Sequence, residues 1–384
     1  MTQALVNGRI FGAQGLLADH ALLFAHGRII DIVREDDARV RAAAAEGQLH
    51  DLQAALLLPG FIDLQVNGGG GVLFNDEPTV AGIRAIGDAH RRHGTTGFLP
   101  TLISDDLSVV AQAIAAVQEA ITAGVPGVMG IHIEGPYLSQ LRKGVHNSAL
   151  IRRPDADIVA LLSGLTNGTT LVTLAPEITT PETLRQLHAR GVVLSAGHSN
   201  ATYADIMTAL KNGVTGFTHL FNAMSQLTGR EPGVVGAALH DPDSYCGIIV
   251  DGHHVDPVVL RIALSAKRHD RFMLVTDAMP CAGTELTSFM LQGRRISVQG
   301  DYCVDDAGTL AGTALTMDRA VRNATALLGL PQATAIRMAS EYPAGFLGLG
   351  AQLGRIAPGY RANLVAVDAT LNVQGTWIDG RMVP

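Results

Sequence analysis

The chain has 384 residues, of which 47% are hydrophobic and 16% are charged, so it can bury a large core. Its formal net charge of −7 includes no acidic or basic tail, and we expect neither nucleic acid nor a membrane surface as a partner. No apolar run reaches the roughly 18 residues of a membrane span, and the first residues lack a signal-peptide pattern, which predicts a cytoplasmic protein. The three cysteines include no Cys-x-x-Cys pair and are expected to be free thiols: Cys246, Cys281 and Cys303.

The two ends of the chain share one pattern. Residues 3–33 have the alternation of β-ribbons, with a turn at His26-Gly27, and the residues after 355 again combine strand-like runs with Gly and Pro turns. Because these segments flank the rest of the chain, we predict one small β-sandwich domain formed by residues 1–58 and 355–384.

The middle of the chain, residues 59–354, alternates short apolar runs with helix-like segments. One such helix is predicted to begin after Asn200 and to end at Gly213. The repeat of about 30 residues is the size of a βαβ unit. Eight units predict a (β/α)8 TIM-type barrel, with an open doubly wound sheet as the alternative. The predicted strands are 61–66, 96–102, 127–133, 170–175, 192–197, 214–218, 245–250 and 272–276. A hairpin insertion over 285–310 and a closing helix over 313–328 follow the last of them.

Polar residues follow most of these strands directly. They include Gln65, Asn67, Thr101, Glu134, Glu177, His198, His219, Asp251, His253, His254 and Asp277. The carboxyl ends of all strands meet on one face of a barrel, where such enzymes have their active sites. The placement of polar residues at the strand ends favours the closed barrel over the open sheet.

Three of the strand ends form a metal-ligating set. Glu134 ends IHIE, His198 ends LSAGH and His219 ends GFTH. One carboxylate and two imidazoles leave a coordination position open, as in catalytic zinc sites. Asp277, which follows the last strand, could accept a proton from water and pass it to a leaving group.

Several ordered motifs carry a resemblance that covers nearly the whole chain. They are PGFIDLQVNG, HIEGP, KGVHN, SAGHSNA, THLFNAM, TGREPG, DGHHVD and LVTDAM. Together they resemble the N-acetylglucosamine-6-phosphate deacetylase family of the amidohydrolase superfamily. The resemblance implies metal ligands at Glu134, His198 and His219, and an acid/base at Asp277. It also implies that His146 bonds the acetamide carbonyl and that the sugar phosphate is held by Asn222, the backbone of Ala223, Arg230 and His254.

The first barrel strand departs from a pattern common in that superfamily. Many amidohydrolases have Asp-x-His-x-His there, whereas this chain has Asp63, Gln65 and Asn67. An amide is a poor ligand beside imidazole or carboxylate, and TLVTLAPE offers no lysine to bridge two metals. We therefore predict one divalent metal per subunit, zinc being expected and iron, manganese or cobalt being alternatives. Gln65 either bonds the attacking water or fills the vacated space.

The resulting functional prediction is metal-dependent hydrolysis of N-acetylglucosamine 6-phosphate to glucosamine 6-phosphate and acetate. The alternatives are a preference for the galactosamine epimer, a different amidohydrolase, or a non-catalytic barrel scaffold. The resemblance further implies a homodimer in which Arg230 reaches the site of the neighbouring subunit. Arg142 and Lys143 are expected to be solvated loop residues, and His90 and His93 to lie at an exposed helix end.

Overall fold

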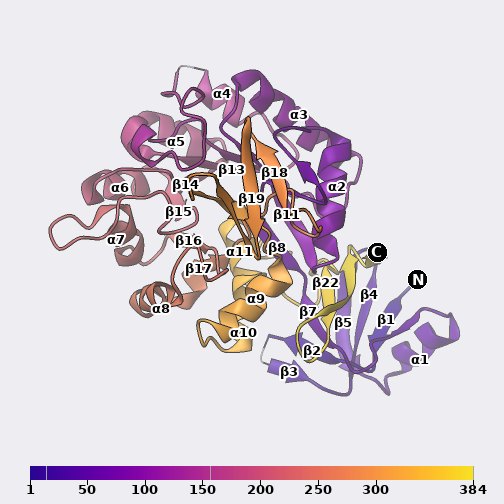
Figure 1. The fold of residues 1–384 in the computed structure, drawn as a ribbon. Helices are drawn as coiled ribbons and strands as arrows, with labels where there is room; N and C mark the ends of the chain where they lie inside the picture. The colour runs from indigo at the N-terminus through magenta and orange to yellow at the C-terminus, as the bar shows by residue number, and fades with distance from the viewer. Residues whose placement is uncertain (14, 156, 384) are drawn as a thin grey trace.

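The computed structural model describes residues 1–13, 15–155 and 157–383 (Figure 1). Its main body is an eight-stranded parallel sheet in which each strand pairs with the next along the chain. A bridge between Val66 and Ala278 joins the first strand to the segment after the last, so the sheet closes into the predicted (β/α)8 barrel. The strands are β8 (Phe61–Val66), β11 (Thr95–Ile103), β12 (Gly130–Glu134), β13 (Thr169–Leu174), β14 (Val193–Ala196), β15 (Val214–Phe217), β16 (Tyr245–Ile248) and β17 (Phe272–Leu274).

The barrel strands are apolar because both of their faces are covered. Every residue of β8, β11 and β12 is buried, as expected of parallel strands between a packed interior and outer helices. The helices around the barrel are α2 (Val80–Arg91), α3 (Leu107–Thr122), α4 (Ile158–Leu162), α5 (Pro181–Ala189), α6 (Tyr203–Leu210), α7 (Gly233–His240), α8 (Pro257–Ala266) and α9 (Met317–Ala326). Two further helices, α10 (Gln332–Met338) and α11 (Glu341–Phe346), pack against β17. No helix in the described ranges is long and apolar enough to cross a membrane.

Both predicted ends of helix α6 differ from the structure, in which the helix ends at Leu210 and not at Gly213. Helix α6 begins after Thr202, not after Asn200, because the Thr202 hydroxyl accepts from the backbone of Asp205 and the Asp205 carboxylate accepts from Thr202 in return. This capping box satisfies two backbone donors at once. Asn200 instead accepts a hydrogen bond from Arg142, in the loop that follows the metal-ligand strand β14.

The small terminal domain contains two sheets, and the larger one combines strands from both ends of the chain. In the larger sheet, C-terminal strand β22 pairs antiparallel with N-terminal strand β7, and Ile10 and Leu364 belong to one apolar cluster that both ends supply. The larger sheet is β24-β23-β22-β7-β2-β3 and the smaller is β5-β4-β1-β6. Their bounds are β1 (Gln3–Val6), β2 (Arg9–Gly12), β3 (Gly15–Leu17), β4 (His20–Ala25), β5 (Arg28–Arg34), β6 (Leu49–Asp51), β7 (Leu56–Pro59), β22 (Leu364–Val367), β23 (Val373–Ile378) and β24 (Arg381–Val383), with α1 (Ala38–Ala45) beside the smaller sheet. The division at residues 58 and 355 remains a prediction.

The segment after β17 forms a four-stranded antiparallel insertion beside the barrel mouth (Figure 1). It consists of β18 (Ser288–Leu291), β19 (Arg294–Gln299), β20 (Tyr302–Asp305) and β21 (Leu310–Thr313), and so has four strands where the sequence predicted a hairpin. A two-stranded ribbon, β9 (Gly68–Gly69) with β10 (Val72–Leu73), follows β8 at the same end. The insertion and the ribbon share an apolar cluster that includes Leu73 and Leu291. They therefore frame one side of the barrel mouth.

Candidate metal centre

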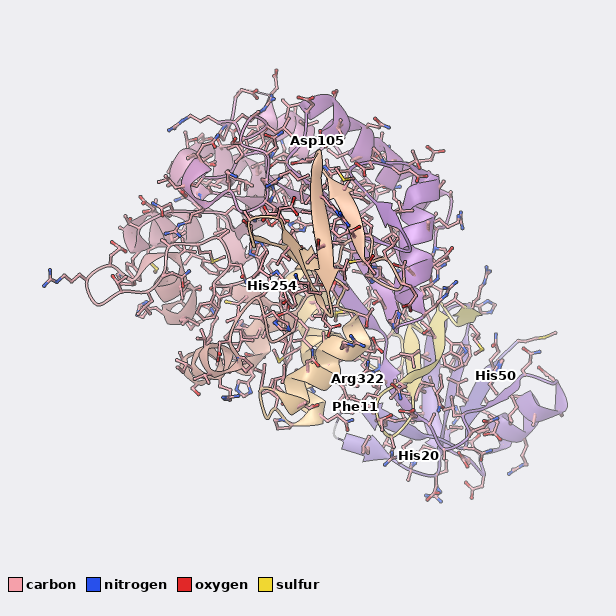
Figure 2. All side chains as sticks on the ribbon, viewed as in Figure 1. Phe11, His20, His50, Asp105, His254 and Arg322 are labelled. Atoms are coloured by element: carbon pink, nitrogen blue, oxygen red, sulfur yellow. The ribbon has the colours of Figure 1, made fainter. Side chains whose placement is uncertain are left out.

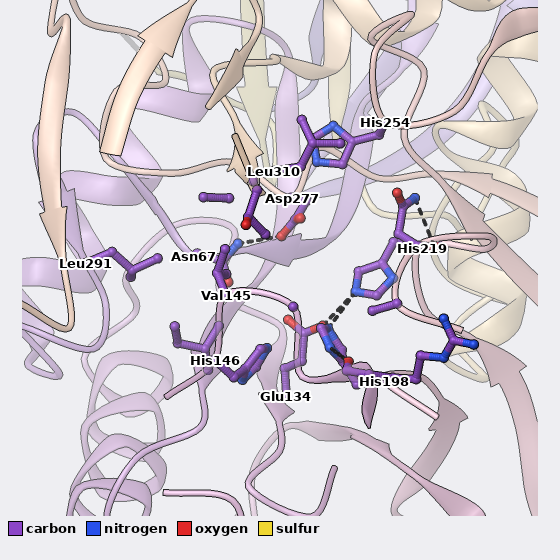
Figure 3. Close-up of a pocket in the computed structure, with 18 of the residues that line it drawn as sticks. Asn67, Glu134, Val145, His146, His198, His219, His254, Asp277, Leu291 and Leu310 are labelled. Atoms are coloured by element: carbon purple, nitrogen blue, oxygen red, sulfur yellow. Dashed lines mark hydrogen bonds and ion pairs between the residues drawn. The ribbon is translucent and has the colours of Figure 1, made fainter. Parts of the chain in front are cut away.

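A cavity of about 340 Å³ lies at the carboxyl ends of the barrel strands. Figure 2 shows His254 at this end of the barrel, whereas Phe11, His20 and His50 lie in the small domain. The cavity contains nearly all the site residues expected from the sequence (Figure 3). Its lining includes Asn67, Glu134, Arg142, His146, His198, His219, Asn222, Ala223, His254, Asp277, Met279, Leu291 and Leu310–Gly312.

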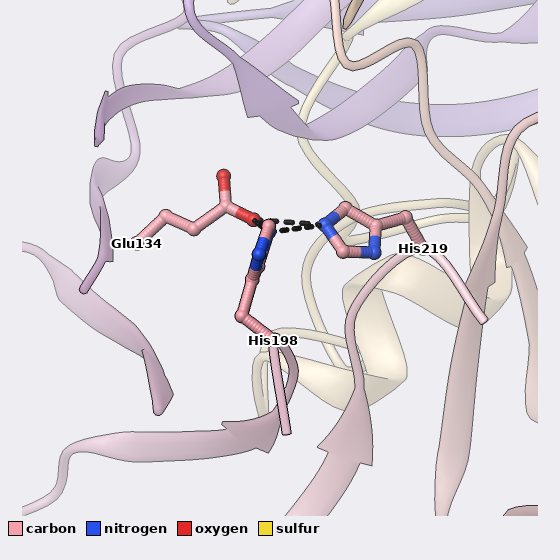
Figure 4. Close-up of side chains that lie close together, drawn as sticks. All are labelled: Glu134, His198 and His219. Atoms are coloured by element: carbon pink, nitrogen blue, oxygen red, sulfur yellow. Dashed lines mark hydrogen bonds and ion pairs between the residues drawn. The ribbon is translucent and has the colours of Figure 1, made fainter. Parts of the chain in front are cut away.

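The three predicted metal ligands converge on one point (Figure 4). The Oε1 atom of Glu134 lies 3.1 Å from Nε2 of His198 and 2.9 Å from Nε2 of His219, and the two Nε2 atoms are 3.0 Å apart. Metal–ligand bonds of about 2.0–2.2 Å at tetrahedral angles bring ligand atoms to similar separations. The geometry therefore fits a single cation bound by these three residues.

The surroundings orient these ligands for a cation. Nδ1 of His198 lies 2.9 Å from the carbonyl oxygen of Arg142 and donates its hydrogen there, so the Nε2 lone pair faces the other ligands. Burial alone would raise the pKa of Glu134, but its contacts with His198 and His219 outweigh the burial and hold that pKa well below its usual value. An ionised carboxylate facing two imidazole nitrogens is the donor set that a divalent metal requires.

Asp277 lies beside the ligand cluster, held by the amides of the first strand. Its Oδ1 accepts hydrogen bonds from Nδ2 of Asn67 at 2.6 Å and from Nε2 of Gln65 at 3.1 Å. Gln65 also donates to Oε2 of Glu134 at 3.2 Å. Burial, followed by the charge of Glu134, raises the pKa of Asp277 to about 6. Gln65 thus bridges the ligand carboxylate and the expected base, a role that neither sequence-based alternative included.

His146 faces the cavity with a defined hydrogen-bonding state. Its Nδ1 accepts from the backbone N–H of Ser104 at 3.3 Å, and the Ser104 hydroxyl lies 2.8 Å from the same atom. Burial, and next the nearby His198 ring, lowers the pKa of His146 well below its usual value. A neutral ring whose Nδ1 is an acceptor carries its hydrogen on Nε2. Sequence reasoning missed Ser104, although its place directly after β11 was a usable signal.

The far side of the cavity is formed by His254, Asn222 and Ala223. Nδ1 of His254 donates to Oδ2 of Asp251 at 2.6 Å, which leaves Nε2 of the ring available to a ligand. Ala223 has a positive φ of 50°, as do the strand-end residues His198 (48°) and Asp277 (52°). Such backbone conformations are uncommon for non-glycine residues and cluster at functional sites.

Two arginines near the site differ in their placement. Arg230 is exposed on the loop after β15 and is not among the residues that line the cavity. Arg142, expected to be a solvated loop residue, is half-buried in the cavity wall, and its Nε donates to Asn200 Oδ1 at 2.9 Å. Arg142 is the only arginine or lysine among the described residues of that lining.

Two other histidines expected outside the site also have clear partners. His90 is fully buried, contrary to the expected exposed helix end, because its Nε2 donates to the carbonyl oxygen of Gly68 at 2.9 Å. His93 is half-buried beside Asp318. Neither belongs to the ligand cluster: His90 connects helix α2 to the first loop, and His93 connects the end of α2 to helix α9.

Comparisons with known proteins agree with this geometry. The sequence matches the amidohydrolase family over residues 56–383, and the chain therefore belongs to that family. It is 45% identical, over 86% of its length and 84% of the relative, to the N-acetylgalactosamine-6-phosphate deacetylase of Shewanella sp. (strain ANA-3). It is 38% identical, over 99% of both chains, to the N-acetylglucosamine-6-phosphate deacetylase of Haemophilus influenzae. The crystal structure of N-acetylglucosamine-6-phosphate deacetylase from Pasteurella multocida superposes with a TM-score of 0.94 at 38% identity and covers both chains fully.

Proposed function

We propose that this protein hydrolyses the acetamide of N-acetylglucosamine 6-phosphate, giving glucosamine 6-phosphate and acetate in amino-sugar catabolism. The observation that carries the proposal is the convergence of Glu134, His198 and His219 beside Asp277 in one cavity. Family membership and the deacetylase relatives support the same chemistry. A scaffold protein has no physical need for an open ligand set next to a base, so the non-catalytic alternative is disfavoured.

We assign one divalent cation, with zinc as the expected metal, to Glu134, His198 and His219. When bound there, the cation supplies Lewis acidity that polarises the acetamide carbonyl and lowers the pKa of the attacking water. We expect no second metal, because the amides of Gln65 and Asn67 already donate hydrogen bonds to Asp277. Donating NH2 groups cannot act as metal ligands in that orientation.

In the proposed reaction, Asp277 accepts the proton of the attacking water and later gives it to the leaving nitrogen. Asn67 and Gln65 hold one oxygen of this carboxylate, so the other oxygen is free to move the proton. The Nε2–H of His146 donates to the carbonyl oxygen and stabilises the charge that develops on it. The Ser104 contact keeps that hydrogen on Nε2 throughout.

At the other end of the substrate, we assign the sugar phosphate to Asn222, the backbone of Ala223, His254 and Arg230. A guanidinium suits phosphate through paired hydrogen bonds. Because Arg230 is exposed and does not line the cavity of its own chain, we propose that it completes the site of a second subunit in a homodimer. The three free cysteines support a reducing compartment, and we place the enzyme in the cytoplasm.

The galactosamine epimer is the second candidate substrate, since the Shewanella relative of 45% identity carries that name. Acetate release should be measured from both epimers, with and without a chelator, using Asp277→Asn as the inactive control. We expect chelator-sensitive release from N-acetylglucosamine 6-phosphate at the higher kcat/KM. Faster turnover of the galacto epimer would make N-acetylgalactosamine 6-phosphate the preferred substrate. If neither epimer releases acetate, the assignment is overturned.

A further inference from the structure

Two cysteines far apart in the sequence lie side by side near the cavity. The Sγ atoms of Cys281 and Cys303 are 3.5 Å apart, and both residues are buried. The third cysteine, Cys246, belongs to barrel strand β16 and to a different apolar cluster. The chain therefore contains one close thiol pair and one separate thiol, which can serve as an internal control.

The pair joins two segments that border the site. Cys281 follows Asp277 and Met279 in the loop after β17, while Cys303 is on β20 of the insertion. Both sulfurs belong to an apolar cluster shared by the loop and the insertion. Four buried members of that cluster also line the cavity, namely Ile103, Met279, Leu291 and Ala311. A bond between the sulfurs would connect the segment that carries Asp277 to the insertion that forms one wall of the cavity.

The two thiols are chemically unequal. A hydrogen bond from Cys303 lowers the pKa of Cys281, whereas that same hydrogen bond, followed by burial, raises the pKa of Cys303. Cys281 therefore has the greater thiolate character, which controls reaction with oxidants. By contrast, burial raises the pKa of Cys246 to about 12.

We propose that Cys281 and Cys303 are a modification site at which hydrogen peroxide forms a reversible disulfide between the insertion and the loop that carries Asp277. The sulfur of Cys281 attacks one peroxide oxygen, the O–O bond breaks, and a sulfenic acid and water result. The sulfur of Cys303 then attacks that of Cys281, the S–O bond breaks, and a second water leaves. Two thiols are oxidised and one peroxide is reduced to two waters. An S–S bond of about 2.05 Å requires the sulfurs to approach by roughly 1.5 Å, and a dithiol such as dithiothreitol reverses the step by exchange.

The linkage can be tested on the full-length, metal-loaded protein. After peroxide treatment, the protein is denatured, alkylated and analysed by mass spectrometry. We expect the loss of two hydrogen atoms, alkylation of Cys246 alone, and a peptide pair joined through Cys281 and Cys303 that disappears after dithiothreitol. Alkylation of all three cysteines, or separate sulfinic acids at Cys281 and Cys303, would overturn the proposal.

Two variants and one kinetic measurement sharpen the test. Cys246→Ser should retain the linked peptides, and Cys303→Ser should lose them. Trypsin cleavage after the exposed Arg295, which lies within the loop closed by the disulfide, should be slower in the oxidised protein than in the reduced one. The difference should vanish in Cys303→Ser, and equal cleavage rates in oxidised and reduced wild-type protein would show that the bond does not restrain the insertion.

Discussion

The two halves of the cavity are built differently. The half that contains the candidate metal ligands consists of side chains at the ends of barrel strands, and Glu134, His198 and His219 are each at most 5% exposed. The half assigned to the phosphate consists of loop residues, and its expected guanidinium, that of Arg230, lies outside the cavity of its own chain. In the proposed function, the barrel strands of one chain therefore supply the chemical step, while recognition of the substrate's charged end is assigned to loops and to a neighbouring subunit.

A change at Asp277 is expected to have the largest effect on the chemical step while leaving substrate recognition intact. Asp277→Asn removes the proton acceptor but keeps the shape of the side chain, so kcat should fall by roughly 10²–10⁴. Bound metal and the KM for substrate should change little, because the three ligands and the phosphate contacts remain. Metal content and steady-state kinetics check this prediction, and near-normal turnover would show that another group moves the proton.

His146 should show a smaller effect of the same kind. His146→Ala removes the Nε2–H donor proposed to bond the carbonyl oxygen, and loss of one such donor typically lowers kcat by about 10²–10³. Ser104→Ala is the matched variant, since the backbone N–H that fixes the ring remains. If both variants lower kcat equally, the ring orientation depends on the Ser104 hydroxyl instead.

Substitution of Arg230 should weaken substrate binding and therefore raise KM. Hydrogen bonds to charged groups are worth about 1.5–3 kcal/mol, so Arg230→Ala should raise KM for the phosphorylated sugar by roughly 10- to 100-fold. The unphosphorylated sugar should be nearly unaffected. Arg142→Ala is the comparison variant, because Arg142 lines the cavity within its own chain.

Mixing subunits tests whether that contribution crosses an interface. Asp277→Asn and Arg230→Ala subunits are each impaired, but some of their heterodimers would contain one intact composite site. Partial rescue is expected after verified subunit exchange. A fully active monomer in sedimentation at the assay concentration would exclude a shared site.

The smallest expected effect concerns the carboxamides behind Asp277. Asn67→Ala removes one of two hydrogen bonds to the carboxylate while Gln65 retains the other. A fall in kcat of about tenfold, corresponding to the low end for a hydrogen bond to a charged group, is expected with little change in KM. An effect on KM alone would place Asn67 in the recognition half of the cavity.

The sequence predicted the barrel and the ligand cluster because both follow from strand register. Alternating apolar strands and helices predict the barrel, and its geometry brings Glu134, His198 and His219 to one face. The hydrogen bonds of Gln65 were not predictable, since a strand position gives the direction of a side chain and not the partners that two other strands bring to it.

Sequence reasoning also failed where tertiary contacts outweigh local pattern. His90 was expected at an exposed helix end and Arg142 in a solvated loop. Instead, the first loop buries His90, and a hydrogen bond to the loop after β14 holds Arg142 in the cavity wall. Asn200 is an equally suitable capping residue, but helix α6 begins after Thr202 because Thr202 and Asp205 form reciprocal hydrogen bonds there. In each case the missing information was a contact partner.

Metal titration of the apoprotein tests the central claim most directly. Zinc added to chelator-treated protein should restore acetate release in a linear rise that stops at one equivalent per chain, since Glu134, His198 and His219 form one site and Gln65 and Asn67 donate to Asp277 instead of binding metal. A rise that continues to two equivalents, with two metals retained after dialysis, would contradict the account.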